Sequence, residues 1–189
     1  NNFARRDGGA LATFSPFAIV PDGITIEDST ISGNTAENGG GVANTERGVI
    51  AIRRSLIANN AATAIGVGGS GGGVLSNSSG KTAITDSTIV ANTAAGNGGG
   101  VFNNNFSFVT IDHSTITGNV ANSGGGVGAF APVVLSDSIV ADNTDGRGSP
   151  NCLNFSITDG GGNFTDDIGS AFPCPATFTE TAALNLDVL

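Results

Sequence analysis

A repeated unit restricts the fold of this chain more than any other feature of its sequence. A serine followed five residues later by an asparagine recurs five times, and the surrounding apolar pattern recurs with it. The five pairs are Ser29 and Asn34, Ser55 and Asn60, Ser87 and Asn92, Ser114 and Asn119, and Ser138 and Asn143. Successive asparagines are 26, 32, 27 and 24 residues apart, within the period of roughly 20 to 50 residues that is typical of solenoids and propellers. A fixed unit with variable spacing predicts a constant cross-section with turns of different length.

Two rows of aliphatic residues keep constant offsets from these pairs. The first row is Ile26, Ile52, Ile84, Ile111 and Leu135. The second row is Ile31, Ile57, Ile89, Ile116 and Val140. Most are β-branched and alternate with polar residues at a period of two, which favours half-buried strands over helices. We therefore predict an all-β solenoid of five to six coils, with about three short strands per coil and each strand paired with its copies above and below at roughly 4.8 Å.

Asparagines and glycines mark the predicted corners of each coil. Identical asparagine side chains stacked at strand spacing can bond amide to amide along the axis, and asparagine tolerates the left-handed backbone of a sharp turn. Triple glycines indicate a second corner, where positive φ or close backbone approach excludes a Cβ. They are residues 39–41, 71–73, 98–100 and 124–126. The valines that follow them restart a strand: Val42, Val74, Val101 and Val127.

The charge balance excludes several classes of partner. Seven basic and sixteen acidic residues give a net charge of −9, which opposes binding to nucleic acid and to an anionic bilayer surface. No run of about 18 apolar residues is present, so we expect no membrane insertion. Tryptophan and tyrosine are absent, so the aromatic surface consists of phenylalanine alone. The sequence indicates no cofactor.

The two cysteines, Cys152 and Cys174, lie near the end of the repeat region. A metal site would lack further ligands of the usual kind, because His113 is the single histidine. We therefore expect a structural disulfide and, with it, an oxidising compartment.

Several segments depart from the regular unit. Residues 8–11 match the later glycine corner, so the stack is expected to start in mid-coil, and residues 13–20 predict an apolar strand. The apolar, glycine-rich residues 61–70 predict a protruding loop. Three phenylalanines around residues 103–105 predict either packing between turns or a surface patch: Phe102, Phe106 and Phe108. Since the first residue is not methionine, we expect a processed or excised piece.

The repeats and the C-terminal segment resemble known families. The Ser-x-Ile, Asn and triple-glycine pattern over residues 8–143 resembles bacterial secreted right-handed parallel β-helix proteins, including the repeats of polymorphic outer-membrane proteins. Residues 151–189, with Asn151-Cys152, Gly161-Gly162-Asn163-Phe164 and Cys174, are similar to the C-terminal part of surface proteins grouped by a choice-of-anchor region. The resemblance implies a right-handed β-helix on the cell surface or outside the cell.

One column of residues could carry chemistry. Immediately before the five serines stand Asp28, Arg54, Asp86, His113 and Asp137, which should stack one coil apart with Arg54 between two acids. Alternating charges on a solvated face are the ordinary interpretation. A catalytic interpretation would require His113 to be held with Asp86 or Asp137 in a cleft. The basic residues of β-helix lyases and the paired carboxylates of β-helix hydrolases cannot be matched to this sequence.

We therefore expect one domain, with coils over residues 1–150 and a disulfide-containing segment over residues 151–189 that completes it. The favoured function is an extracellular structural or adhesive module, with enzymatic activity less favoured. The expected partners are further coils or a second copy at open ends, and a polysaccharide. The alternatives are a fragment of a polysaccharide lyase or hydrolase, or a repeat surface that binds carbohydrate or ice through threonine and asparagine rows. Four Asn-x-Ser/Thr sequons are also present, at Asn77, Asn105, Asn154 and Asn163.

Overall fold

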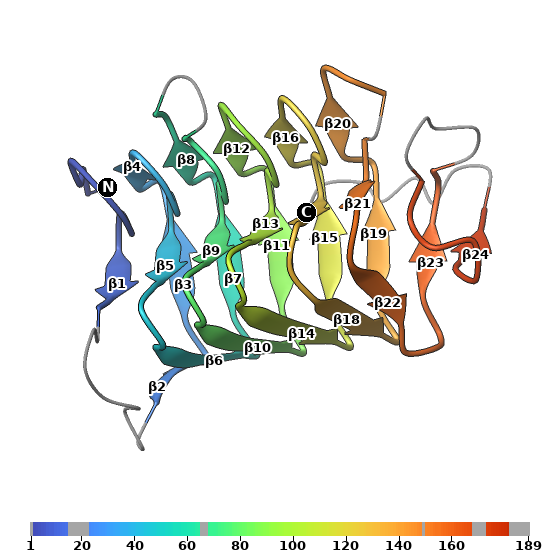
Figure 1. Ribbon diagram of the computed structural model, residues 1–189, viewed down its shortest axis with the longest axis horizontal. Helices are drawn as coiled ribbons and strands as arrows, with labels where there is room; N and C mark the ends of the chain where they lie inside the picture. The colour runs from blue at the N-terminus through green and yellow to red at the C-terminus, as the bar shows by residue number, and fades with distance from the viewer. Residues whose placement is uncertain (1, 15–22, 65–67, 149, 168–172, 182–189) are drawn as a thin grey trace.

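The computed structural model describes residues 2–14, 23–64, 68–148, 150–167 and 173–181. Within these ranges the chain forms four parallel sheets and no helix (Figure 1). Each complete coil contributes one strand to each sheet, and each strand pairs with its copy in the next coil. The predicted all-β parallel solenoid is confirmed, although a coil contains four strands and not three.

Each sheet is named here by its first strand. The β1 sheet contains β1 Leu11–Thr13, β5 Val42–Asn44, β9 Val74–Ser76, β13 Val101–Asn103, β17 Val127–Ala129 and β21 Cys152–Asn154. The β2 sheet contains β2 Ile24–Glu27, β6 Val49–Arg53, β10 Lys81–Thr85, β14 Phe108–Asp112, β18 Val133–Ser136 and β22 Ile157–Asp159. The β3 sheet contains β3 Thr30–Ser32, β7 Leu56–Ala58, β11 Thr88–Val90, β15 Thr115–Thr117, β19 Ile139–Ala141, β23 Phe164–Thr165 and β24 Thr179–Glu180. The β4 sheet contains β4 Thr35–Ala36, β8 Ala61–Ala62, β12 Thr93–Ala94, β16 Val120–Ala121 and β20 Thr144–Asp145.

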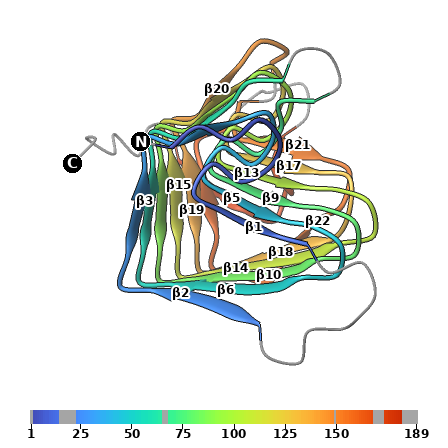
Figure 2. The ribbon, with the colours of Figure 1, turned by 90° about the vertical axis from the view of Figure 1, so that its left-hand side faces the viewer.

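An end-on view shows how the sheets enclose the core. In Figure 2 the β1, β2 and β3 sheets form three sides around the interior, and the short β4 strands lie at the top. Seen from the N-terminal side, the chain runs clockwise through the β2, β3, β4 and β1 sheets as it recedes, so the helix is right-handed. This hand agrees with the rule for crossovers between parallel strands.

The predicted aliphatic rows form the core. Ile26, Ile52, Ile84, Ile111 and Leu135 are consecutive partners across the β2 sheet. Ile31, Ile57, Ile89, Ile116 and Val140 are consecutive partners across the β3 sheet. All are buried except the partly buried Ile31. The valines after the glycine corners add a third buried row, and Cys152 is the next member of that row.

The predicted disulfide is present and joins Cys152 to Cys174, with Cα atoms 5.0 Å apart. Both cysteines belong to the hydrophobic core, as does Phe178. The strands β21, β22 and β23 continue the β1, β2 and β3 sheets. Residues 151–165 therefore extend the same stack and do not form a separate unit.

An asparagine ladder runs through the interior. The side-chain Nδ2 of each asparagine donates to Oδ1 of the next at 2.9–3.0 Å, from Asn34 through Asn60, Asn92 and Asn119 to Asn143. Each Oδ1 also accepts the backbone N–H of the preceding asparagine. Asn2 adds a bond at the start of the ladder, and Asn151 adds one at its end. Every rung therefore satisfies buried polar groups of two coils.

A second ladder was not predicted from the sequence. The backbone N–H of Ser29, Ser55, Ser87 and Ser114 donates to the hydroxyl of the next serine at 3.1 Å. Each hydroxyl in turn donates to the carbonyl oxygen two residues earlier in its own coil. The serines thus close the corner between the β2 and β3 sheets.

The left-handed corner residues differ from those expected. None of the five ladder asparagines has positive φ, because the residue before each one takes that conformation: Gly33, Asn59, Ala91, Gly118 and Asp142. The asparagine itself stays extended so that its side chain can point inward. At the other corner the expectation is confirmed, since Gly71 has φ +69° and a Cβ on Gly72 would lie 2.4 Å from two carbonyl oxygens.

Three further segments can be compared with expectation. Residues 15–20 of the expected strand lie outside the described residues, and only Leu11–Thr13 form strand β1 there. Ala61–Ala62 belong to strand β8, so the insertion begins later than predicted, and its residues 65–67 are also outside the described ranges. Phe102 is buried, whereas Phe106 and Phe108 are exposed. The three therefore do not form one packed cluster.

We predict that Asn92→Ala lowers the free energy of unfolding by about 3 kcal/mol, because the change leaves several buried donors and acceptors unpaired. Asn92 accepts two bonds from Asn60 and donates to Ile57 O and Asn119 Oδ1. Urea unfolding followed by far-ultraviolet circular dichroism is the measurement, since the chain has no Trp or Tyr. The exposed Asn122→Ala is the control, and equal effects of the two variants would contradict the role of the ladder.

Candidate functional site

The charged column lies at the corner between the β2 and β3 sheets. Its five residues share a left-handed backbone with φ between 45° and 49°: Asp28, Arg54, Asp86, His113 and Asp137. Inter-coil backbone bonds place them one above another. Positive φ is uncommon outside glycine but is more frequent for Asp, Asn and His, which accounts for four of the five residues. The outward direction of this corner keeps the side chains in solvent.

Arg54 pairs with acids on its N-terminal side. Its Nε and Nη2 bind the Asp28 carboxylate at 2.8 and 3.0 Å, and Nη2 also binds Glu27 Oε1 at 2.5 Å. The Arg54 hydrogen bond lowers the pKa of Asp28 against a small opposing effect of burial. Arg54 stacks between Asp28 and Asp86 as expected, but its ion pairs among the described residues are with Asp28 and Glu27 and not with Asp86. About half of each side chain is exposed, so these pairs contribute little stability.

His113 stands between two carboxylates. Its Nδ1 lies 3.0 Å from Asp112 Oδ2, and its Nε2 lies 3.9 Å from Asp137 Oδ2. The hydrogen bond and charge of Asp112 raise the pKa of His113, with smaller contributions from Asp137 and Asp86. The structure therefore brings together Asp86, His113 and Asp137 as the sequence suggested. It adds Asp112, which the column pattern did not include because Asp112 belongs to strand β14.

The chemistry open to this cluster is limited by its exposure. The side chains of Asp112, His113 and Asp137 are 42–59% exposed, whereas general acids and bases are usually tuned by burial. Their ligand atoms lie within 4.8 Å of one another. His113 Nε2 and Asp137 could therefore share a divalent cation while Asp112 orients the ring through Nδ1. Cys152, Cys174 and Asp167 also lie close together, but the disulfide removes the thiolates that a metal would need.

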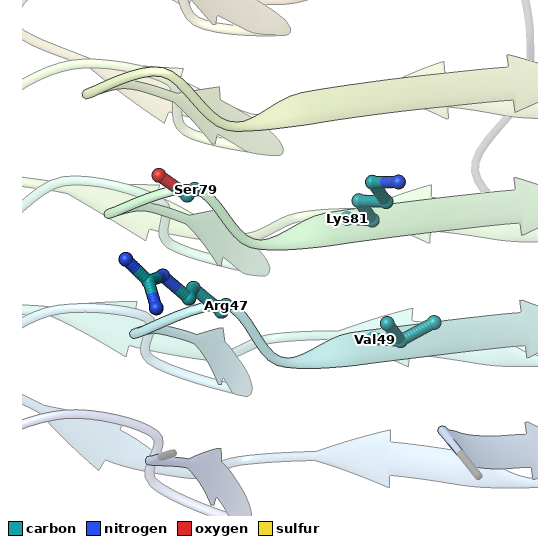
Figure 3. Close-up of a pocket in the computed structure, with 4 residues that line it drawn as sticks. All are labelled: Arg47, Val49, Ser79 and Lys81. Carbon is teal, nitrogen blue, oxygen red and sulfur yellow. The ribbon is translucent and has the colours of Figure 1, made fainter. Parts of the chain in front are cut away.

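Two concavities lie beside the turns that join the β1 and β2 sheets. The first, of about 290 Å³, is lined by Arg47, Val49, Ser79 and Lys81 (Figure 3). The second, of about 380 Å³, lies nearer the N-terminus and includes Arg6, Asp7 and Glu46. Neither concavity was predicted from the sequence. The feature that could have indicated them is the equal length of three turns, each of four residues: 45–48, 77–80 and 104–107.

Comparison of the chain with protein-family models, with curated proteins and with solved structures gives no match. Within the described ranges, no helix is long and apolar enough to cross a membrane. The function must therefore be argued from the geometry of the stack itself.

We predict that the imidazole of His113 titrates above its ordinary pKa of 6.5. Because the folded-state pKa exceeds the unfolded-state value, protonated His113 stabilises the folded chain below about pH 6.5, and this contribution is lost as the pH rises through the folded-state pKa. NMR titration of this single histidine measures the shift. Asp112→Asn should lower the pKa more than Asp137→Asn. An equal or reversed effect would contradict the assignment of Asp112 as the main cause.

Proposed function

We propose that the chain is a rigid structural and adhesive β-helix module of a bacterial protein that works on the cell surface or outside the cell. The observation that carries this proposal is the unbroken register of the stack. The β1 and β2 sheets each contain six strands in register, and the β3 sheet contains seven. Such a rod resists bending because every coil is bonded to both neighbours.

Three features support an extracellular location. The Cys152–Cys174 disulfide lies in the core, and disulfides of this structural kind persist in oxidising compartments. The resemblance of the repeats to secreted and surface β-helix proteins points the same way. Net charge of −9 favours solubility at high concentration outside the cell.

The two ends of the stack differ in chemistry. At the N-terminal end, Ile24 is 38% exposed and Ile31 is partly buried, and no described strand pairs with the outer edges of β2 and β3. At the C-terminal end, the two aliphatic rows continue into polar residues, one into Asp159 and the other into Thr165 and then Glu180. The unpaired, apolar edge favours completion of the N-terminal end by further coils of a parent protein or by a second copy.

The enzymatic alternative rests on the Asp112–His113–Asp137 cluster. Its exposed position on a convex corner favours an electrostatic role over catalysis. The alternative of ice or carbohydrate binding through asparagine rows is disfavoured, because the ladder asparagines are buried. The outward threonine row on the β3 sheet is interrupted by Leu56 and Ile139.

We predict that the chain does not turn over polysaccharides. Acidic and neutral polysaccharides would be incubated with the wild-type chain, with His113→Ala and with Asp86→Ala, and new reducing ends and unsaturated products would be measured. Equal, background-level signals for the three proteins are expected. Turnover by the wild type that is lost in either variant would contradict the structural proposal.

We also predict concentration-dependent association through the N-terminal edge. Small-angle X-ray scattering should show particles that lengthen while their cross-section stays constant. Ile24→Lys places a charge at the open edge and should return the chain to monomers, because edge charges oppose strand pairing. Leu56→Lys, on an outward face, is the matched control and should not. Growth of the cross-section, or a monomer at all concentrations, would contradict axial assembly of this chain.

A further inference from the structure

Two rows of residues run along the rod beside the turns between the β1 and β2 sheets, and the surface between them is called the trough here. Its outer wall is a row of turn residues, Arg47, Ser79 and Phe106, which backbone bonds place one above another. Its inner wall is the row of strand residues Val49, Lys81 and Phe108. Figure 3 shows the first two levels, with Arg47 and Ser79 on the turns and Val49 and Lys81 on the strands. The cavity of about 290 Å³ lies between these four residues.

The trough is limited to three coils. The turns at residues 45–48, 77–80 and 104–107 each have four residues between the strands. In the next coil, Val109 N–H bonds to Pro132 O and Phe130 N–H bonds to Asn103 O, so this turn lacks two residues that would continue the outer wall. Two steps of roughly 4.8 Å separate the first and third levels, which gives a length of about 10 Å. A ligand of two or three sugar-sized units would occupy it.

The N-terminal half of the trough is cationic. Arg47 and Lys81 are both exposed, and neither forms an ion pair with a described residue. The nearest acidic neighbour in sequence, Glu46, lines the other concavity. Two uncompensated cations in one depression of a chain with net charge −9 provide a local attraction for an anionic group.

The C-terminal half is aromatic. Phe106 is 94% exposed and has φ +60°, and Phe108 is 41% exposed. The left-handed backbone is shared by the equivalent turn residues Arg47 and Ser79, so the turn itself directs the Phe106 side chain outward. The faces of such rings attract the C–H groups of a sugar, because the ring face carries partial negative charge.

We propose that the trough binds an acidic oligosaccharide along the helix axis. This inference rests on the proposed adhesive function and names its ligand class. Separate acidic groups of the sugar bind Arg47 and Lys81, which lie on opposite sides of the cavity (Figure 3), and an adjoining sugar ring packs against Phe106 and Phe108. The site is a shallow one, so its affinity is modest and adhesion would depend on several modules acting together.

A single-stranded nucleic acid would use the same residue types, but the trough suits it less. One phosphate per nucleotide requires a continuous cationic track, whereas the third level of the trough has no cation. The surplus of acidic residues over the whole chain also opposes a dense polyanion. A sugar chain with acidic groups at one end and an uncharged unit at the other matches the observed order of cations and rings.

Isothermal titration of the full chain at low salt tests the proposal. The probes are a uronic-acid tetrasaccharide, a sulfated tetrasaccharide, a neutral tetrasaccharide, inorganic sulfate and a tetrathymidylate. At least one acidic tetrasaccharide should bind about ten-fold or more tightly than the neutral one, and added salt should weaken that binding. Arg47→Gln and Lys81→Gln should each weaken it about ten-fold, the size expected for losing a hydrogen bond to a charged group.

Matched variants separate the trough from the rest of the rod. Phe106→Ser copies the residue that Ser79 supplies at the same place in the neighbouring coil and should weaken both acidic sugars without changing the melting temperature. Arg53→Gln, exposed at the other end of strand β6, should leave binding unchanged. The proposal is overturned by equal binding of neutral and acidic sugars, by sulfate or tetrathymidylate binding as tightly as the sugars, or by absence of sugar binding. Axial assembly measured by scattering is independent of these results.

Discussion

Hydrogen bonding between equivalent residues of neighbouring coils is the constraint on which the rest of the structure depends. A parallel ladder alone would tolerate a shift of two residues, because side chains would keep their inward or outward direction. The asparagine ladder removes this freedom, since a shifted coil would bury amides without partners. The serine ladder does the same at the next corner. Buried Asn60, Asn92 and Asn119 therefore fix the register that lets the isoleucine rows align.

Because register is fixed at two corners, length variation is confined to the turns between other strands. The second coil gains residues after Ala61–Ala62, and the fifth loses two in its turn before β18. Neither change disturbs the rows of the core. Turn residues such as Arg47, Ser79 and Phe106 lie outside the two ladders, so their residue type can differ from one coil to the next. We therefore expect a binding surface where equivalent positions of neighbouring coils carry different residues.

The parts predicted from sequence are those in which one physical demand repeats. Ile52, Ile84 and Ile111 had to be apolar in every coil, and their rows were readily recognised. The β4 strands were missed because two residues such as Thr35–Ala36 are too short to show alternation. The left-handed residue was misplaced by one position because asparagine tolerates that conformation and recurs in every coil, whereas the residue that adopts it differs from coil to coil. Glycine, the residue type that indicates a left-handed backbone, stands at the correct position in only two coils, as Gly33 and Gly118.

The candidate sites were harder to predict because they combine unlike residues. His113 was found through its column, but its main partner Asp112 lies on a neighbouring strand and in a different row. The trough joins an arginine, a lysine and two phenylalanines whose relation exists only once three coils are stacked. Sequence periodicity identifies the residues that every coil shares. A ligand that binds at one place on the rod must recognise residues that differ between coils. The fold could therefore be predicted from the repeat, whereas the sites could be found only in the folded structure.

The charge of the chain bears on how such rods associate. Free strand edges occur only at the ends of the four sheets among the described residues, so side-by-side contact would rely on side chains alone. A surplus of nine negative charges opposes that contact at distances within the screening length of roughly 8 Å. End-to-end contact encounters less of this repulsion and gains main-chain hydrogen bonds along with burial of Ile24 and Ile31. The acidic composition therefore favours the proposed association along the axis over side-by-side contact, and such association leaves the trough accessible on the side of the rod.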